Sequence, residues 1–488
     1  MSPYSRPHDP NLMTHGPSHT VPPVVGHPLV AWTSHAVLFA ALTGCAPTRV
    51  PEVPPREGDV AGQPAAFALE DGVARMAAAH LDGGLWPGFD PLAVPLAVYD
   101  GTRTVLFRHP SPPPEFTPVP GAPGVVALNG RHEDVVANTS AEIGGVLTAT
   151  VMLGGSGRPL TDPAAVAVHE AFHVHQAARH PDWQANEADL FVYPTDDPDA
   201  LALRRLETAA LRRALGAEGA ARAACWSRAA LALRAERYAR LDSASARYER
   251  MTELNEGLAA YVEARAAGRV TVDLPAAEFG PADVRLRAYA TGPALAFLLD
   301  RSDPGWRTAF DADDGLLDAA LARALGSGET CAFGRAETDA AERQAQRDVA
   351  ELHAQRASRL AAFEGRPGWR VVVEVPEHVM WVEGFDPLNV DRVDAGRVLH
   401  RRMLRLANER GRLQMIDTDT VDVEALTEAA GEHPLFSGVA RVVVAELDEP
   451  TVTEAGGAVE VSAPGLTASF ENARVERSGR TVTIRMAP

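Results

Sequence analysis

The feature that most constrains the fold is a long block of helical periodicity in the middle of the chain. Between residues 163 and 364, apolar residues recur at the spacing of amphipathic helices, and glycine or proline separates most of the segments. The run GRPG at 365–368 ends this block, because glycine and proline together interrupt regular structure. The helices expected within the block are 200–215, 220–240, 244–267, 282–299 and 335–363.

Patterns typical of β-strands lie on both sides of the helical block. Before it, residues 65–160 include strand candidates, and the last of them, VLTATVML at 146–153, is rich in β-forming residues. After it, residues 366–488 combine strand candidates with one expected helix at 393–410. The strands expected in these two regions are 96–99, 104–107, 125–128, 146–153, 369–375, 440–447, 458–462, 466–470 and 481–485.

A chain of 488 residues exceeds one ordinary domain, so we expect two or three. The fold class predicted is α+β. A small mixed α/β N-terminal subdomain (65–160) and a largely helical part (161–365) would form one domain, and residues 366–488 would form a separate C-terminal α+β domain.

An apolar stretch near the N-terminus has the length of a signal-peptide core. Residues 29–42 are too few to span a bilayer as a helix. They run into Leu42-Thr43-Gly44-Cys45, which resembles the lipobox of bacterial lipoproteins. The resemblance implies a leader at 1–44, lipidation of Cys45, and a Pro-rich tether at 45–64. Because only Arg6 supplies a firm positive charge before the apolar core, a disordered tail with a chance apolar stretch is the alternative.

Cysteine content and net charge indicate the cellular compartment of the protein and the partners that it lacks. Besides Cys45 the chain has only Cys225 and Cys331, which in an exported domain could form one disulfide or stay as two buried thiols. The formal net charge of -19 lacks the basic footprint that nucleic-acid binding requires. We therefore expect an extracytoplasmic protein attached to the membrane of a bacterial cell envelope by its N-terminal lipid, with no nucleic-acid partner.

The segment 169–173 has the pattern H-E-x-x-H, and the residues around it suit a helix. Two histidines four residues apart lie on one helix face, so the imidazoles of His169 and His173 can bind one Zn²⁺ ion. Glu170, beside the first histidine, would act as the general base that takes a proton from zinc-bound water. The alternative is a helix with two ordinary histidines.

A zinc enzyme needs a third protein ligand and one open position. The sequence LNEGLAAYVE at 254–263 resembles the second zinc helix of the gluzincins, the thermolysin-like and aminopeptidase-N-like peptidases. This resemblance implies that Glu256 is the third ligand. The 82 residues between His173 and Glu256 are many more than in that family, so the helices between them would be an insertion. Glu207 within this insertion is the rival third ligand, and a surface charge near arginines is the simpler interpretation of it.

The same resemblance implies roles for other residues. Tyr289, in a segment similar to the helix that follows the zinc helices of aminopeptidase-N-like enzymes, would assist the oxyanion, although a core tyrosine explains it equally well. Asn255 would support the ligands through a hydrogen bond. Packing and surface exposure are sufficient explanations for Tyr261 and Glu263 respectively. The strand at 146–153 would be a sheet edge that pairs with the substrate backbone, or otherwise an ordinary buried strand.

Together these patterns predict a zinc-dependent metallopeptidase of the cell envelope, with Zn²⁺ as its cofactor and a peptide or protein as its substrate. An endopeptidase is favoured because the amine-binding motif of aminopeptidases is not visible. Two alternatives stay open. One is a catalytically inactive gluzincin-like lipoprotein that binds envelope partners, against which the intact Glu170 argues. The other is a zinc hydrolase that acts on a non-peptide amide.

Overall fold

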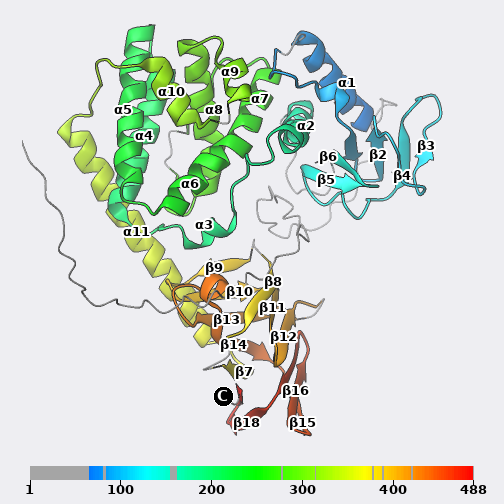
Figure 1. Cartoon of the computed structure of the whole chain (residues 1–488). Coiled ribbons are helices and arrows are strands. Elements are labelled where there is room, and N and C mark those ends of the chain that lie inside the picture. Colours follow the sequence, from blue (N-terminus) through cyan, green and yellow to red (C-terminus); the bar gives the residue numbers. More distant parts are fainter. Residues whose placement is uncertain are drawn as a thin grey trace, which may run out of the picture. The chain divides into compact units, whose positions relative to one another are not determined.

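The computed structural model describes residues 65–80, 84–153, 162–275, 279–313, 315–375, 379–386, 389–418 and 421–486. Helices and strands are both abundant in them, which confirms the α+β class (Figure 1). The leader, Cys45 and the tether lie outside the described residues, so the predictions made for them stay predictions. Among the helices described, none is both long and apolar enough to cross a membrane.

The N-terminal part combines one helix, α1 (Ala65–Ala79), with a six-stranded sheet in the order β3-β4-β2-β1-β6-β5. Strand β6 pairs in parallel with β1 and antiparallel with β5. The bounds of the short helix η1 and of the strands are Pro91–Ala93 (η1), Leu96–Tyr99 (β1), Arg103–Phe107 (β2), Thr117–Pro118 (β3), Val126–Asn129 (β4), Thr139–Ile143 (β5) and Val146–Met152 (β6).

The prediction that the strand at 146–153 is a sheet edge is wrong, because β6 lies between β1 and β5. Strand β5 is the outer strand on that side among the strands described. A two-residue turn at Gly144 and Gly145, both with positive φ, folds β5 back onto β6. The sequence of β5, TSAEI, carries few β-forming residues, so its strand depends on pairing with β6 and is not visible from composition.

The helical block has the boundaries expected from the sequence. Its last helix ends at Glu364, and the next strand begins at Trp369. Helix α2, which carries the H-E-x-x-H pattern, packs against α1, β6 and α7 (Figure 1). The bounds are Pro163–Arg179 (α2), Ala188–Val192 (α3), Pro198–Leu215 (α4), Ala220–Tyr238 (α5), Ser243–Thr252 (α6), Glu253–Gly257 (η2, a π-helical turn), Leu258–Ala266 (α7), Val284–Ser302 (α8), Trp306–Ala312 (α9), Leu317–Leu325 (α10) and Arg335–Glu364 (α11).

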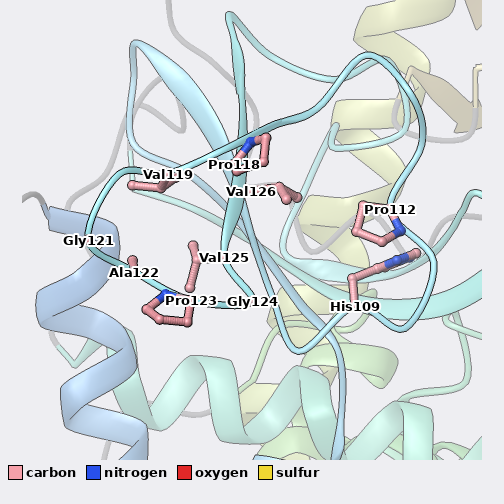
Figure 2. A pocket seen from close by; sticks show the side chains of 10 residues that line it. All are labelled: His109, Pro112, Pro118, Val119, Gly121, Ala122, Pro123, Gly124, Val125 and Val126. Atoms are coloured by element: carbon pink, nitrogen blue, oxygen red, sulfur yellow. The ribbon is translucent and has the colours of Figure 1, made fainter.

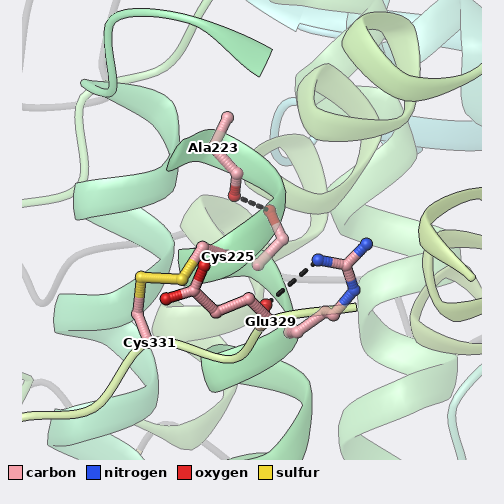
Figure 3. The surroundings of a disulfide bond; sticks show 6 residues. Ala223, Cys225, Glu329 and Cys331 are labelled. Carbon is pink, nitrogen blue, oxygen red and sulfur yellow. Dashed lines mark hydrogen bonds between the residues drawn. A yellow bond between two sulfur atoms is a disulfide. The ribbon is translucent and has the colours of Figure 1, made fainter. Parts of the chain in front are cut away.

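A disulfide joins Cys225 of α5 to Cys331, which follows α10 (Figure 3). The Cys331 amide also donates to the Cys225 carbonyl (3.3 Å), and Arg228 Nη1 donates to the Glu329 carbonyl (3.1 Å). The segment around Cys331 is therefore fixed to α5 by one covalent and two polar contacts. Of the two possibilities open from the sequence, the structure has the disulfide.

The C-terminal domain is a pair of facing β-sheets. A seven-stranded sheet (β18-β19-β7-β14-β13-β10-β9) and a six-stranded sheet (β15-β16-β17-β12-β11-β8) contribute side chains to one apolar core. The bounds are Trp369–Glu374 (β7), Trp381–Phe385 (β8), Val390–Arg392 (β9), Arg397–Arg401 (β10), Met403–Asn408 (β11), Gly411–Ile416 (β12), Glu424–Ala429 (β13), Pro434–Ser437 (α12), Val439–Leu447 (β14), Thr451–Ala455 (β15), Ala458–Ala463 (β16), Leu466–Glu471 (β17), Ala473–Ser478 (β18) and Thr481–Met486 (β19).

The helix predicted at 393–410 is wrong, since this segment forms β10 and β11. Its apolar residues fit a helical spacing, but the buried Leu404 and Leu406 alternate with the exposed Arg405 as in a strand. Arg402 has a φ of 73° and separates the two strands. Pairing with neighbouring strands decides between two patterns that the sequence alone leaves equivalent, so this domain is a β-sandwich with one short helix among its described residues.

We expect the disulfide to stabilise the helical part substantially. The bonded cysteines are 106 residues apart, so the bond removes much chain entropy from the unfolded state. The paired change Cys225→Ser/Cys331→Ser should lower the free energy of unfolding by about 2–4 kcal/mol in urea titrations. Dithiothreitol should reproduce this loss in the wild type and leave the double variant unaffected; an unaffected wild type would show that the bond is not formed.

A second prediction concerns the acid stability of the C-terminal domain. Burial, together with a smaller effect of the nearby His433, lowers the pKa of His400 to about 3. The unfolded chain, with a pKa of about 6.5, therefore binds more protons between pH 6.5 and 3, and stability falls as the pH falls through this window. The cost is about 1.4 kcal/mol per pH unit. His400→Gln should lose less stability than the wild type between pH 7 and pH 4; equal losses in urea titrations would contradict the assignment.

Candidate metal centre

The two histidines of helix α2 meet side by side. The Asp162 side chain accepts a hydrogen bond from the Ala165 amide (3.1 Å) and caps the helix, and the next residue is the proline that begins it. One helical turn separates His169 from His173, and their Nε2 atoms lie 3.1 Å apart. With Glu170 they form a largely buried group whose ligand atoms lie within 4.8 Å of one another, so the group could hold a metal ion.

Glu256 reaches the same point from the π-helical turn η2. Its Oε2 atom lies 3.3 Å from His173 Nε2 and 3.8 Å from His169 Nε2. Bonds of about 2.0–2.1 Å to a tetrahedral ion would place ligand atoms about 3.3 Å apart, so these separations suit a metal ion. The structure therefore brings together the three side chains that the sequence predicts as ligands.

The hydrogen bonds on the outer side of each imidazole decide which nitrogen carries the proton. His169 Nδ1 donates to Glu263 Oε2 (3.1 Å), and His173 Nδ1 donates to Gln176 Oε1 (2.9 Å). With Nδ1 occupied in this way, the Nε2 atom of each ring is directed toward the other ring and toward Glu256. Two ring nitrogens and one carboxylate oxygen therefore converge on one buried point, which a bound cation or a proton on an imidazole can stabilise.

The Glu256 Oε2 atom supports this interpretation. It is fully buried and has no hydrogen-bond donor in good geometry among the described residues. A buried carboxylate oxygen without a partner is costly, and a bound cation would remove that cost. Burial lowers the pKa of His169, but the nearby carboxylates of Glu256 and Glu263 outweigh it and raise that pKa to about 10. The pocket therefore attracts positive charge, which a proton or a metal ion can supply.

Sequence reasoning missed the residues that orient the histidines. Gln176 donates through Nε2 to the carbonyl oxygens of Leu254 (2.9 Å) and Asn255 (3.1 Å), so its Oε1 is held toward His173. Asn255 was expected to support the ligands through a hydrogen bond, and its backbone oxygen accepts one from Gln176. Glu263 is not the surface charge that was expected, since it bonds His169. The signal that could have found Gln176 is its position three residues after His173 on the same face of α2.

Glu170 and Tyr289 complete the site. Burial raises the pKa of Glu170, and so do Glu256 and Glu263, so this carboxylate accepts a proton more readily than an exposed one. The Tyr289 ring stacks against the His169 ring, with centroids 6.3 Å apart. Burial and the charge of Glu256 raise the pKa of Tyr289, so it stays a protonated donor. Tyr289 therefore lies beside the predicted ligands, and its role as an oxyanion donor stays a prediction.

Two glycines allow helix α8, which carries Tyr289, to approach η2. A Cβ atom on Gly257 would lie 2.7 Å from the Gly292 Cα, and one on Gly292 would lie 2.5 Å from the Gly257 Cα. Both distances are too short for real contacts, so the two backbones touch only because both residues are glycine. The glycine that follows Glu256 therefore sets the distance between the third ligand and the helix of Tyr289.

Glu207, the rival third ligand, belongs to a different site. Its oxygens accept hydrogen bonds from Arg234 Nε (2.8 Å), Arg237 Nη2 (2.7 Å) and Arg287 Nη2 (2.7 Å). Burial alone would raise its pKa, but these guanidinium groups hold the pKa of Glu207 far below its usual value. The interpretation as a surface charge is also wrong, since Glu207 is completely buried. Tyr261 has the packing role expected of it, and its hydroxyl donates to Asp300 (2.8 Å).

A cavity of about 510 Å³ lies in the N-terminal part, and its lining includes none of the candidate site residues (Figure 2). Its lining is mainly proline, glycine and valine from the loop around β3 and β4. His109 also lines the cavity, and its Nε2 atom donates a hydrogen bond to the Ile143 carbonyl (2.9 Å). None of the metal-ligating residues lines it.

No protein-family model matches this chain, and no curated protein or solved structure is significantly similar to it. The site is therefore interpreted from its own geometry.

We expect zinc binding to distinguish Glu256 from Glu207. Glu256→Gln removes a ligand charge, and zinc content by elemental analysis should fall from near one per chain to a small fraction of that. Glu207→Gln should keep its zinc but lower the free energy of unfolding by about 3–5 kcal/mol, because three buried guanidinium groups lose their partner. The reverse pattern would transfer the ligand role to Glu207.

Proposed function

We propose that this protein is a zinc-dependent hydrolase that cleaves peptide bonds. The observation that carries the proposal is the convergence of His169 Nε2, His173 Nε2 and Glu256 Oε2 on one buried point, with Glu170 beside them. Two imidazoles and one carboxylate, with room for a further ligand, are the donor set of catalytic zinc sites. The resemblance of the two motifs to those of gluzincins supports peptide bonds as the substrate.

In this proposal each residue of the site has a defined task. Bound zinc would supply a Lewis acid that polarises the carbonyl and makes water more acidic. Glu170 takes a proton from the attacking water and later gives it to the leaving amine, which suits its raised pKa. The Tyr289 hydroxyl donates a hydrogen bond to the oxygen on which negative charge develops. Glu263 and Gln176 accept hydrogen bonds from the Nδ1 atoms and so direct each Nε2 atom toward the position of the ion.

We further propose that an extended substrate pairs with the outer edge of β5. This strand has a partner on one side only among the strands described, and it contacts α2. Backbone pairing at a sheet edge binds a peptide with little regard to its side chains. The absence of a visible amine-binding motif favours cleavage within the chain over removal of N-terminal residues.

Location in the cell envelope is part of the proposal. The Cys225–Cys331 disulfide supports an oxidising compartment outside the cytoplasm. The lipobox-like Leu42-Thr43-Gly44-Cys45 supports attachment through a lipid on Cys45.

The test is hydrolysis of a peptide library by residues 65–488, with products identified by mass spectrometry. Glu170→Gln should reduce kcat/KM by about 10²- to 10⁴-fold, because it removes the general base while its shape is kept. Zinc content of this variant should equal that of the wild type, so that a loss of activity reports on Glu170 alone.

The remaining outcomes separate the alternatives. Full activity in Glu170→Gln would contradict the proposed mechanism, because the variant has no general base at this position. A wild type that binds one zinc but cleaves no peptide points to a binding protein, or to a hydrolase of other amides if a parallel screen of non-peptide amides shows turnover.

A further inference from the structure

The Arg285 guanidinium lies directly behind the third ligand. Its Nη2 atom donates to Glu256 Oε1 (2.7 Å), the carboxylate oxygen that does not face the histidines. Its Nη1 atom donates to the Tyr289 hydroxyl oxygen (2.9 Å). One side chain in the first turn of α8 therefore contacts both the third ligand and the proposed oxyanion donor.

The contact with Glu256 determines which of its oxygens is free. A carboxylate can bind a metal ion through one oxygen or both. Since Oε1 accepts a charged hydrogen bond from Arg285, only Oε2 is directed at the two Nε2 atoms. The site is thereby limited to three protein donor atoms, which leaves a position open for water and substrate.

The contact with Tyr289 determines where its proton points. A hydroxyl oxygen that accepts a hydrogen bond from a guanidinium directs its own O–H elsewhere. The same guanidinium donates to the Tyr289 hydroxyl and to Glu256, so this hydroxyl lies close to the predicted ligands. Arg285 thus orients a donor as well as a ligand.

Arg285 is itself held by the segment inserted between the two motif helices. Its Nε atom donates to Glu187 Oε1 (3.2 Å), and the Tyr248 hydroxyl donates to Glu187 Oε2 (3.1 Å). Glu187 precedes α3, and Tyr248 belongs to α6 and is almost completely buried. The fork of the guanidinium is therefore fixed at all three nitrogens by Glu187, Glu256 and Tyr289.

We propose that Arg285 is a positioning residue that restricts Glu256 to one-oxygen ligation and orients the Tyr289 hydroxyl, and that the inserted segment holds Arg285 in place through Glu187 and Tyr248. The inference rests on the proposed function for the metal and for Tyr289. It gives the segment between the two motifs a part in positioning the site.

The experiment uses Co²⁺ in place of zinc, because its visible spectrum reports coordination number. Arg285→Gln should bind Co²⁺ about 10- to 100-fold more weakly in competition with a chromophoric chelator. Its absorption should weaken, as expected when Glu256 ligates through both oxygens and the coordination number rises. Arg285→Lys keeps the charge without the fork, so its affinity should lie between those of the wild type and Arg285→Gln. Arg301→Gln, on the same helix but bonded to the Ala214 and Leu215 carbonyls, is the matched control and should keep wild-type binding.

Catalysis provides an independent readout. If Arg285 acts through Tyr289, then kcat of the Arg285→Gln/Tyr289→Phe double variant should be close to that of Tyr289→Phe at equal metal loading, because neighbouring changes on one path are not additive. Fully additive losses would remove the orienting role.

The outcomes remain separable from those of the proposed function. Unchanged Co²⁺ affinity and spectrum in Arg285→Gln, or equal losses in Arg301→Gln, would overturn the positioning role while leaving the metal site intact. If the wild-type protein binds no metal, the proposed function itself is wrong. If Arg285→Gln does not fold, Glu187→Ala decides, since it releases Arg285 while the Arg285–Glu256 pair is kept. A several-fold loss of Co²⁺ affinity supports the proposal, and no loss overturns it.

Discussion

The candidate metal centre depends on the contact of helix α2 with the turn η2. Gln176 joins them, because its amide nitrogen donates to two carbonyl oxygens of η2 and its amide oxygen holds His173. A π-helical turn leaves backbone carbonyls available that an α-helix would use internally, and such turns are frequent at functional sites. One glutamine thus couples the position of the third ligand's backbone to the orientation of a histidine.

The opposite side of η2 is held by an ionic cluster of Glu207, Glu249, Glu253, Arg234, Arg237 and Arg287, all buried. Glu253, three residues before Glu256, accepts hydrogen bonds from Arg234 Nη1 and Nη2 (2.7 Å each) and from Thr291 Oγ1 (2.6 Å). Burying so many charges carries a desolvation cost, which close pairing offsets only in good geometry. Helices α4 and α5, which lie between the two motifs in the sequence, supply Glu207, Arg234 and Arg237. These helices are therefore integral to the packing of the turn that carries Glu256.

Much of the site could be predicted because its chemistry is local in sequence. A helix places residues four apart on one face, so His169 and His173 follow from spacing alone, and Asp162 and Pro163 mark the start of the helix. Glu256 followed only from the resemblance of a second motif. Arg285 and Glu263 could not be predicted, because isolated charged residues on helices are usually exposed and nothing in their spacing points to the histidines.

By itself, the sequence determined the helical block, its end at the glycine- and proline-rich run, and the pair of histidines with their glutamate, since each depends on periodicity or on neighbouring residues. Only the tertiary structure showed that Glu256 and not Glu207 lies beside the histidines, placed β5 outside β6, and made two strands of the segment at 393–410. These outcomes depend on contacts between residues far apart in the chain. Burial among arginines, pairing at a sheet edge and backbone contact between two glycines are properties of the packed molecule, and no local pattern encodes them.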